Sequence, residues 1–318
     1  MNIFKYENYY SDKGYHNIVG IDEAGRGPLA GPVVAVALNW GKKHIIEGVK
    51  DSKKISEKKR LTLYREIIEN ANDIGIGIVH ENQIDEINIL QSTFLAMRKA
   101  VGNLSIKPDI LLVDGNKADI KHYEQKNIIK GDSLSYSIAC ASIIAKVTRD
   151  NLMLEFSKVF PEYNFDKHKG YGTKFHLEMI EKYKSTPIHR KSFNPVSKFL
   201  PKVKDFNTVE KITGLGVKIC SVHYIKDMYK ILDIYDPYDL IVYRNQKIII
   251  NTISVIIKGK TINSKIPLNS INFNSVINYL NTLVTLDDFK QILINKVKVH
   301  MNKSGSKISI IKGSIYDI

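Results

Sequence analysis

The sequence predicts an α/β fold of packed layers over its first 200 residues. Residues 17–22 and 31–38 are apolar runs of strand length, and the first of them ends in acidic residues. The apolar side chains of residues 85–101 recur at helical spacing, and residues 110–114 form a short apolar run typical of a buried strand. Strands that come first and then alternate with helices are typical of α/β layers, which bind their ligands at strand ends.

The remaining elements of this part are predicted from caps and periodicity. Ser56 is of the residue type that caps helix N-termini, and the helix that it opens is expected to run through about Ala71. Residues 74–80 alternate like a strand, while residues 133–159 and 173–183 are expected to form a long and a short helix.

Composition limits the classes of protein to consider. The 318 residues include 47 Lys and Arg against 33 Asp and Glu, and the net charge of +14 favours polyanionic partners without naming one. The only two cysteines, Cys140 and Cys220, lie far apart, which excludes a disulfide scaffold and fits a reducing compartment. With no apolar leader and no apolar run long enough to span a bilayer, we expect a cytoplasmic protein without a membrane partner.

A domain boundary is predicted near Leu200, between a larger α/β domain at 1–200 and a small accessory α+β domain at 201–318. The second part carries 17 basic against 9 acidic side chains and a single glutamate, Glu210. Asn245 and Gln246 are expected to turn a hairpin. The other elements expected there are helices at 222–232, 274–283 and 286–294 and strands at 240–244, 247–250, 252–257 and 307–311.

Four acidic residues stand where such a fold could bring them together. Asp22 and Glu23 are adjacent at the end of the first strand, Asp114 ends another strand, and Asp132 precedes the long helix. Adjacent side chains of a strand point to opposite faces, so the first two can share a site only if the strand bends or ends there. The glycines that follow make this plausible.

Carboxylates in such a group suit one kind of chemistry. Hard divalent cations prefer oxygen ligands. Two Mg²⁺ or Mn²⁺ ions about 4 Å apart can activate a water and stabilise a leaving oxygen in phosphodiester hydrolysis. Each acid taken alone is more often a solvated surface charge, so the interpretation depends on its surroundings.

Those surroundings resemble the bacterial ribonuclease HII family. The resemblance covers about residues 17–197, and its motifs occur in the family's order. The first is GIDEAGRGPLAGPVV at Gly20–Val34. The others are Asp51–Lys54, Leu112–Gly115, Lys130–Asp132 with Ser137–Asp150, His168–Thr173 and Pro187–Phe193.

The resemblance implies a ribonuclease H-like mixed sheet flanked by helices, with Asp22, Glu23, Asp114 and Asp132 as catalytic ligands of two divalent ions, Mg²⁺ or Mn²⁺. It implies an endonuclease that cuts the RNA strand of RNA–DNA hybrids. It also implies cutting on the 5′ side of single ribonucleotides in duplex DNA, which leaves 3′-hydroxyl and 5′-phosphate ends. A family role is the removal of ribonucleotides misincorporated during replication.

Substrate contacts are implied at two places. Gly25, Arg26 and Gly27 resemble a ribonucleotide sensor, whose backbone can approach a sugar closely and read a 2′-hydroxyl. Tyr171 matches a tyrosine that stacks on the sugar of the next, deoxy, nucleotide. Without the resemblance, the first would be interpreted as a tight turn and the second as a packing residue.

Basic and hydroxyl side chains supply candidate phosphate contacts. Lys53 stands in one of the motifs. Ser142, Lys146 and Arg149 share one face of the long helix, an arrangement that suits a phosphate backbone or, equally, a polar helix surface. His168, His189 and Arg190 could lie near the substrate or be structural, and the sequence does not decide between these.

The four carboxylates and the Gly-Arg-Gly sensor favour this interpretation over three alternatives for the first domain. They are a non-catalytic hybrid-binding protein, a resolvase-like nuclease without the Gly-Arg-Gly sensor, and the sister ribonuclease HIII, which resembles this domain but has an N-terminal substrate-binding domain. Residues 201–318 faintly resemble a restriction-endonuclease-like fold. No aspartate occurs there between Asp239 and Asp287, so a second nuclease site is not expected. Binding of DNA or of a protein partner is favoured by the charge, with a neutral appendage as the alternative.

Overall fold

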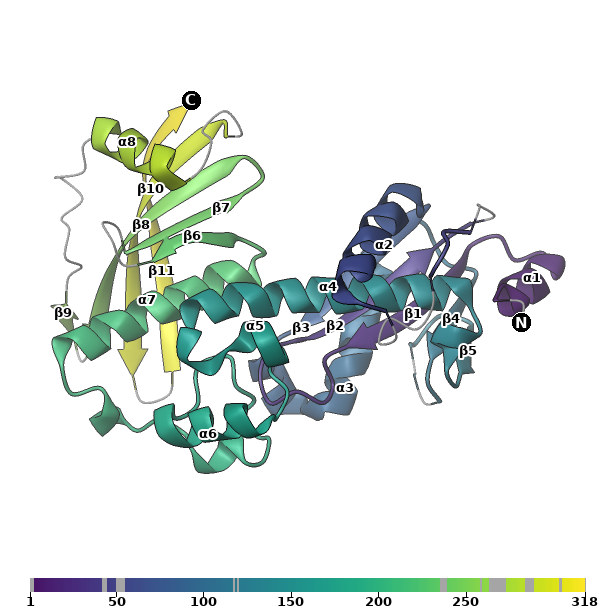
Figure 1. The fold of residues 1–318 in the computed structure, drawn as a ribbon, viewed down its shortest axis with the longest axis horizontal. Helices are drawn as coiled ribbons and strands as arrows, with labels where there is room; N and C mark the ends of the chain where they lie inside the picture. The colour runs from purple at the N-terminus through teal and green to yellow at the C-terminus, as the bar shows by residue number, and fades with distance from the viewer. Residues whose placement is uncertain are drawn as a thin grey trace. The chain divides into compact units, whose positions relative to one another are not determined.

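The computed structural model describes residues 3–41, 45–49, 55–116, 118, 120–234, 239–257, 259–262, 273–283, 289–302 and 305–317 (Figure 1). The chain separates into two compact units. Unit 1 comprises Met1–Met153, His168–Leu177 and Ile188–Lys198, and unit 2 comprises Leu154–Lys167, Glu178–Pro187 and Phe199–Ile318. Two segments that precede residue 200 thus group with the C-terminal part, and the domain boundary near Leu200 stays a prediction.

Unit 1 is built on a mixed five-stranded sheet, as the fold-class prediction required. Its order is β3-β2-β1-β4-β5, in which β1 pairs antiparallel with β2 and parallel with β4. The strands β2–β3 are antiparallel and β4–β5 parallel. Their bounds are β1 Ile18–Ala24, β2 Val33–Asn39, β3 Asp73–Val79, β4 Ile110–Asp114 and β5 Gln125–Ile128.

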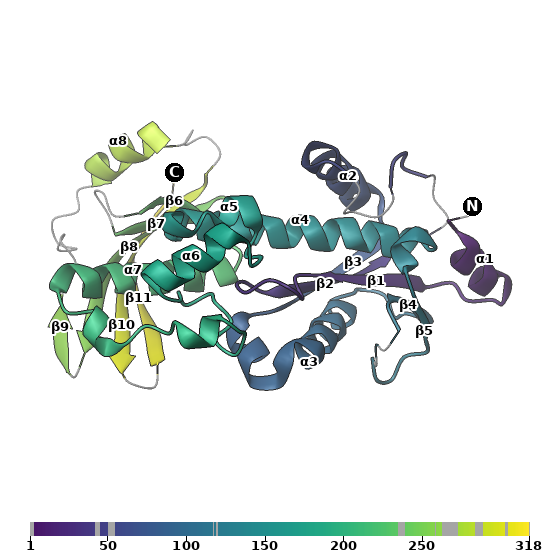
Figure 2. The same ribbon diagram turned by 60° about the horizontal axis from the view of Figure 1, so that its bottom comes forward.

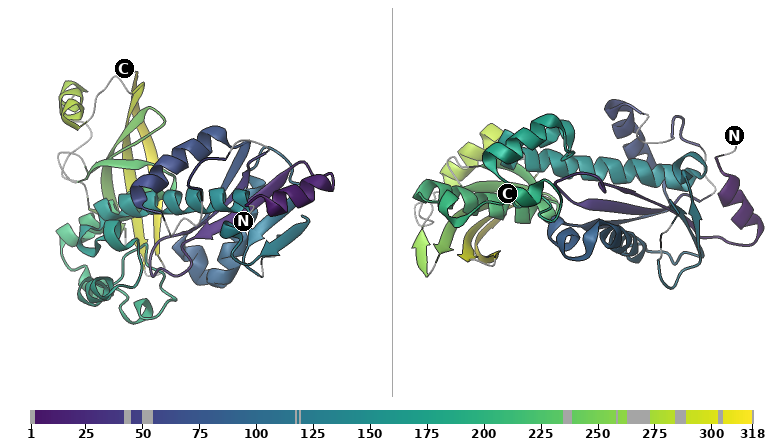
Figure 3. Two further views of the ribbon diagram at one scale, coloured as in Figure 1. Left: turned by 45° about the vertical axis from the view of Figure 1, so that its right-hand side comes forward. Right: turned by 90° about the horizontal axis from the view of Figure 1, so that it is seen from below.

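Helices cover both faces of this sheet (Figure 2). Helices α2 (Glu57–Asn70) and α4 (Tyr136–Val159) lie on one face, where their apolar side chains pack against Val36 and Leu38 of β2. Helix α3 (Glu81–Gly102) lies on the other face and packs against the intervening positions of β1 and β2. The views in Figure 3 show the same arrangement of a sheet between helices from two further directions. Ser56 caps α2 as predicted, since its side chain accepts a hydrogen bond from the Lys59 N–H.

The N-terminal helix α1 (Lys5–Asp12) was not predicted from the sequence. Its Glu7 carboxylate accepts hydrogen bonds from the Ser135 hydroxyl at 2.6 Å and from the Ser137 N–H at 3.0 Å. This anion therefore satisfies donors at the N-terminus of α4, where a negative charge is also favoured by the helix dipole. The shorter helices are η2 Gly131–Ser133, η3 Pro161–Tyr163, α5 Phe165–His168, α6 Lys174–Tyr183, η4 Val196–Lys198 and η5 Val203–Asp205.

Unit 2 contains a second mixed sheet, with the order β11-β10-β8-β7-β6 and with β9 paired to β8. Helix α8 packs on one face through Val276 and Leu280, and helix α7 lies against the other, where Tyr224 donates to Asn251 of β8 at 2.8 Å. The elements are α7 Val209–Lys226, β6 Lys230–Ile234, β7 Leu240–Arg244, β8 Lys247–Ile257, β9 Lys260–Ile262, α8 Phe273–Leu283, β10 Gln291–Asn302 and β11 Gly305–Asp317.

Two of the helix predictions for this unit were wrong, while the strand at 240–244 and the helix at 274–283 were confirmed as β7 and α8. The helix expected at 222–232 ends at Lys226, and the strand β6 begins at Lys230. Where a helix was expected at 286–294, the described residues from Gln291 onward form β10. The register between β10 and β11 shifts between Leu293 and Asn295, where β11 carries one extra residue. The hairpin turn at Asn245 and Gln246 is confirmed, with both residues at positive φ.

The end of α4 belongs to unit 2 and is tied into it. Glu155 accepts a hydrogen bond from the Ile231 N–H at 2.8 Å, and Lys158 donates to the Ile231 carbonyl at 3.0 Å. Lys218 of α7 forms an ion pair with Glu162 at 2.8 Å. Within the described parts of both units, no helix has the length and apolar character needed to cross a membrane.

Candidate active site

Two of the predicted carboxylates come from neighbouring parallel strands. The last register pair between β1 and β4 joins Ile21 to Val113, and Asp22 and Asp114 are the next residues on the two strands. Asp114 is the last residue of β4, and Asp22 lies near the carboxyl end of β1, two residues before it. This is the position where α/β sheets commonly place ligand sites.

The turn after β5 brings Asp132 to the same edge of the sheet. Lys130 has a left-handed backbone (φ 57°), and the following Gly131 N–H donates to the Asp114 carboxylate at 2.7 Å. This bond ties the short helix η2, which carries Asp132, to the end of β4. A hydrogen bond between backbone and carboxylate thus links two acids that are 18 positions apart.

The pKa of Asp22 depends on its burial and on the charges of the other three acidic residues. Its side chain is 8% exposed, and burial raises the pKa of its carboxyl well above the usual range. The negative charges of Glu23, Asp114 and Asp132 raise the pKa further. Because each charge is felt at Asp22, the four carboxylates form one electrostatic group.

Glu23 is placed differently from the expectation. The strand β1 does not end at Asp22 but continues to Ala24, so Glu23 still pairs across to Ala35 of β2. Its carboxylate accepts from the exposed Arg26 guanidinium at 3.3 Å.

The Gly-Arg-Gly turn and Tyr171 lie side by side. A Cβ atom built on Gly27 would stand 3.7 Å from Cε1 of the Tyr171 ring, which is 45% exposed. Gly25 has φ +101°, and a Cβ there would meet the Arg149 Nε at 2.2 Å. Only glycine fits this position, because both the backbone angle and the close approach exclude a side chain.

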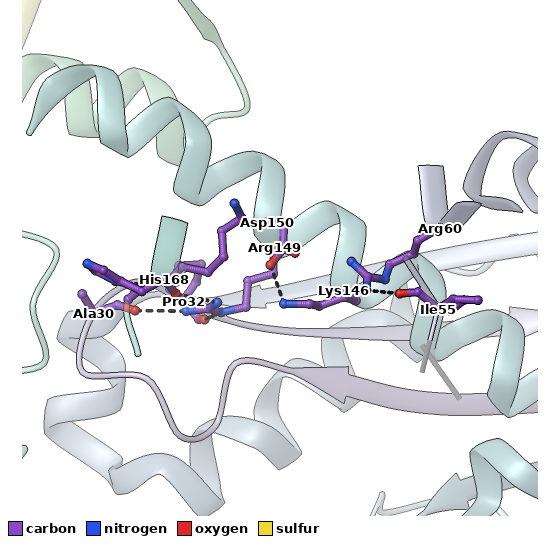
Figure 4. A network of polar contacts seen from close by, with 10 residues as sticks. Ala30, Pro32, Ile55, Arg60, Lys146, Arg149, Asp150 and His168 are labelled. Atoms are coloured by element: carbon purple, nitrogen blue, oxygen red, sulfur yellow. Dashed lines mark hydrogen bonds and ion pairs between the residues drawn. The ribbon is translucent and has the colours of Figure 1, made fainter. Parts of the chain in front are cut away.

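The predicted stripe on α4 is only partly a surface (Figure 4). Lys146 is partly exposed and forms an ion pair with Asp150 at 2.8 Å. Ser142 is 3% exposed, and Arg149 is 1% exposed. The prediction that Arg149 lies on a phosphate-facing or solvated surface was therefore wrong. Its guanidinium instead donates to the carbonyls of Pro32, Ala30 and Lys169 at 3.0–3.1 Å. Lys53 lies outside the described residues.

Arg190 is one of three residues whose role the sequence left undecided. It is fully buried, and its guanidinium donates to backbone carbonyls of the turn between β1 and β2, those of Gly25, Arg26, Gly31 and Pro32. Burial lowers the pKa of Arg190 to about 9 and that of Arg149 to about 10. Both arginines are thus still cations at neutral pH, and they are solvated by carbonyl oxygens.

Three histidines form a cluster that contacts the backbone of Tyr171 through His176. The His176 Nδ1 contacts the Tyr171 carbonyl at 2.9 Å, and its Nε2 lies 3.0 Å from the His189 Nε2. The His168 ring stacks on His176 with 4.4 Å between centroids. Burial lowers the pKa of His176 to about 4 and that of His189 well below the usual range, so both rings are neutral near pH 7. They therefore serve as neutral packing and hydrogen-bonding groups.

Comparison with known proteins settles the family. The family model described as ribonuclease HII matches residues 19–196. The chain belongs to the ribonuclease HII family. The ribonuclease HII of Clostridioides difficile is 58% identical over 193 residues, or 61% of this chain and 75% of that protein. That of Caldicellulosiruptor bescii is 54% identical over 192 residues, or 60% of this chain and 93% of that protein.

The fold agrees with this assignment. The crystal structure of ribonuclease H2 from Pyrococcus horikoshii is similar with a TM-score of 0.50 at 28% identity, over 57% of this chain and 96% of that one. As a ribonuclease HII, the chain is a hydrolase that acts on RNA in RNA–DNA hybrids. Residues 197–318 lie beyond the family match.

The donor set of this ribonuclease HII fits divalent metal ions. All four side chains offer carboxylate oxygens, and the pKa of Asp22 is raised first by burial and then by three neighbouring negative charges, which a cation would offset. Within the described residues, no three side chains of His, Cys, Asp or Glu converge closely enough to hold one ion as they stand. The fit therefore lies in the chemistry of the donors and in their common edge of the sheet.

Proposed function

We propose that this chain is an endonuclease that cuts the RNA strand of RNA–DNA hybrids and also cuts on the 5′ side of single ribonucleotides embedded in duplex DNA. The products would be 3′-hydroxyl and 5′-phosphate ends. The observation that carries the proposal is the position of Asp22, whose pKa is raised by burial and then by the negative charges of Glu23 on β1, Asp114 on β4 and Asp132 on η2.

We assign Asp22, Glu23, Asp114 and Asp132 as ligands of two divalent ions, Mg²⁺ or Mn²⁺. When bound, such ions supply an activated water and stabilise the leaving oxygen. The chain's own contribution is placement, because β1 and β4 fix two of the ligands and the Gly131–Asp114 hydrogen bond fixes the turn that carries the third. Glu23 follows Asp22 directly on β1.

Gly25, Arg26, Gly27 and Tyr171 are proposed to read the ribonucleotide. The adjacency of Gly27 to the exposed Tyr171 ring supports this, because a ribose at the turn and its neighbour under the ring would occupy consecutive positions of one strand. A 2′-hydroxyl both donates and accepts hydrogen bonds, and backbone groups can meet both needs.

The three residues proposed to contact phosphates are supported by different observations. Lys146 is partly exposed and one of its three donors is held by Asp150, which supports a contact to a phosphate. Ser142 is a candidate only through the family resemblance, since its side chain is buried. The same holds for Lys53, which lies outside the described residues.

For unit 2 we propose binding of a nucleic acid. Residues 201–318 carry 17 basic against 9 acidic side chains, and Lys296, Lys307 and Lys312 are exposed on the neighbouring strands β10 and β11. A protein partner is the alternative. It would leave the salt dependence of substrate binding unchanged.

The direct test uses a DNA duplex with one embedded ribonucleotide, an all-DNA duplex and a duplex with four consecutive ribonucleotides, each incubated with Mg²⁺ or Mn²⁺. We expect a single nick 5′ to the lone ribonucleotide and none in the all-DNA duplex. Cutting only of the four-ribonucleotide duplex would indicate the HIII-like specificity. No cutting with either ion would indicate a binding protein.

A further inference from the structure

The turn between β1 and β2 is held from the inside by buried guanidinium groups. Segments 168–171 and 188–190 flank it through backbone hydrogen bonds, from the Leu29 N–H to the Gly170 carbonyl at 2.8 Å and from the Gly31 N–H to the Ile188 carbonyl at 2.8 Å. Inside this frame, Arg190 and Arg149 donate to the turn's carbonyls. The turn's conformation is thus set by residues more than 100 positions away in the sequence.

Arg190 donates hydrogen bonds to the carbonyls of both peptide units of the Gly-Arg-Gly sequence. Its Nη2 donates to the Gly25 carbonyl at 2.5 Å, and its Nη1 donates to the Arg26 carbonyl at 2.8 Å. Arg149 donates instead to Ala30, Pro32 and Lys169. Both arginines therefore hold the turn, but of the two only Arg190 donates to carbonyls of the Gly-Arg-Gly sequence.

The hydrogen bonds from Arg190 also fix the direction of the backbone N–H groups of Arg26 and Gly27, because each peptide unit is planar. The Gly25 carbonyl and the Arg26 N–H belong to one planar trans peptide unit, and the Arg26 carbonyl and the Gly27 N–H belong to the next. Within each unit the C=O and N–H bonds point in opposite directions. Because both carbonyls point at the buried Arg190, both N–H groups point away from it.

We propose that Arg190 is a positioning residue for ribonucleotide recognition: it aims the N–H groups of Arg26 and Gly27 outward, beside the Tyr171 ring, toward the ribose. The inference rests on the proposed function, since it concerns how the same site selects its substrate. A planar fork of donors suits this task, because it can hold several carbonyls at fixed angles, which an ammonium group does not do.

Two variants test the inference. Arg190→Lys keeps the positive charge and removes the fork, and Arg190→Gln keeps a neutral donor without burying an unsolvated ammonium. The control is Leu63→Ala in α2, a fully buried residue of the core between α2, α4 and the sheet, which lowers stability without touching the turn. Thermal unfolding of all three shows which variants fold.

Binding of two labelled duplexes is then measured in EDTA, one with a single ribonucleotide and one entirely of DNA, together with kcat and KM for the first duplex. We expect Arg190→Lys and Arg190→Gln to reduce kcat/KM on the order of tenfold or more and to lose the preference for the ribonucleotide. Affinity for all-DNA, which depends on phosphate contacts, should stay unchanged. Leu63→Ala should keep the preference.

Two results overturn the inference. One is a folded Arg190 variant that keeps the wild-type preference. The other is an equal loss of affinity for both duplexes, which indicates general damage to the fold. If the wild-type protein itself has no preference for the ribonucleotide, the proposed function fails, and that outcome is recognised because it occurs without any substitution.

Discussion

Asp22 of β1 and Asp114, the last residue of β4, occupy matching positions on two parallel strands, each one residue beyond the Ile21–Val113 register pair. The carboxylate of Asp114 also accepts the Gly131 N–H at 2.7 Å, while that of Asp22 accepts the N–H of Glu23 at 2.7 Å. Each acid is therefore oriented by a backbone donor before any cation arrives. An asparagine side chain in place of either aspartate could still accept the same backbone hydrogen bond through its amide oxygen.

We expect Asp114→Asn to reduce the cleavage rate roughly a thousandfold or more, because losing a metal ligand forfeits several kcal/mol of transition-state stabilisation. Duplex binding should stay the same or tighten, since one negative charge near phosphate is removed. The fold should persist, because the amide oxygen can still accept the Gly131 N–H. Single-turnover cleavage and duplex affinity measure both effects.

The matched control is Asp109→Asn at the other end of β4. Asp109 is exposed, and its carboxylate accepts the backbone N–H groups of His16 and Asn17. The same chemical change there should leave cleavage unaffected. Turnover near the wild-type rate in Asp114→Asn would reject the assignment of this carboxylate as a ligand.

Gly20→Ala should destabilise unit 1 by about 1–3 kcal/mol, because helix α4 packs directly on this residue of β1. A Cβ there would lie 2.3 Å from the Ser137 carbonyl carbon. Gly102→Ala, at the end of α3 with nothing within 4 Å of its Cβ, should instead stabilise by about 0.5–1 kcal/mol. Urea unfolding of both variants gives the sign and size, and equal effects would contradict the packing argument.

The sequence predicted the parts of the fold that depend on local patterns. The boundaries of β4 and the cap at Ser56 follow from neighbouring residues, and both agree with the structure. The edge strand β5, with the sequence QKNI, has no apolar alternation and was missed. In β10 the buried positions change from even to odd residue numbers after Ile294, so its sequence has no simple alternation, and a helix was expected over its first residues.

In the candidate site, too, some residues could be predicted from local sequence motifs and others could not. The four carboxylates and the glycines of the turn stand in sequence motifs, and these motifs are sufficient to name them. The role of Arg190 could not be predicted, because its partner Gly25 lies 165 positions away and is contacted through the backbone carbonyl, which leaves no trace in residue type. Arg149 was expected on a surface for a related reason, since helical spacing shows which residues share a face but not what covers that face.

Stability should fall as the pH drops from about 6.5 toward 4, because His176 is held neutral in the folded state. Its pKa is lowered to about 4 by burial, so between these values the unfolded chain binds a proton that the folded chain does not. The stabilisation is fully present above pH 6.5 and is lost on the order of 1–3 kcal/mol through this window. Urea unfolding at pH 5 and pH 7 measures it.

The variants His176→Asn and His122→Asn separate this contribution from general acid effects. His122 is exposed and has a positive φ, a conformation that asparagine adopts readily. We expect His176→Asn to flatten the pH dependence and His122→Asn to leave it as in the wild type. The same slope in all three proteins would show that His176 is not the group responsible.

The salt dependence of substrate binding tests whether unit 2 touches nucleic acid. Truncation at residue 200 would confound the test, because it would remove the contacts of Ile231 and Lys218 with the end of α4. A triple substitution of lysine by glutamine avoids this problem. If Lys296, Lys307 and Lys312 each contact a phosphate, removing them should lower the slope of log affinity against log salt by about two to three.

The control triple changes Lys202, Lys204 and Lys211 to glutamine, which are exposed lysines of the same unit that precede β6. It alters net charge by the same amount, so a general field effect would change both slopes equally. A lower slope only in the variant of β10 and β11 would locate the phosphate contacts on those strands. If neither triple changes the slope, unit 2 does not bind the nucleic acid, and a protein partner becomes the better hypothesis for residues 201–318.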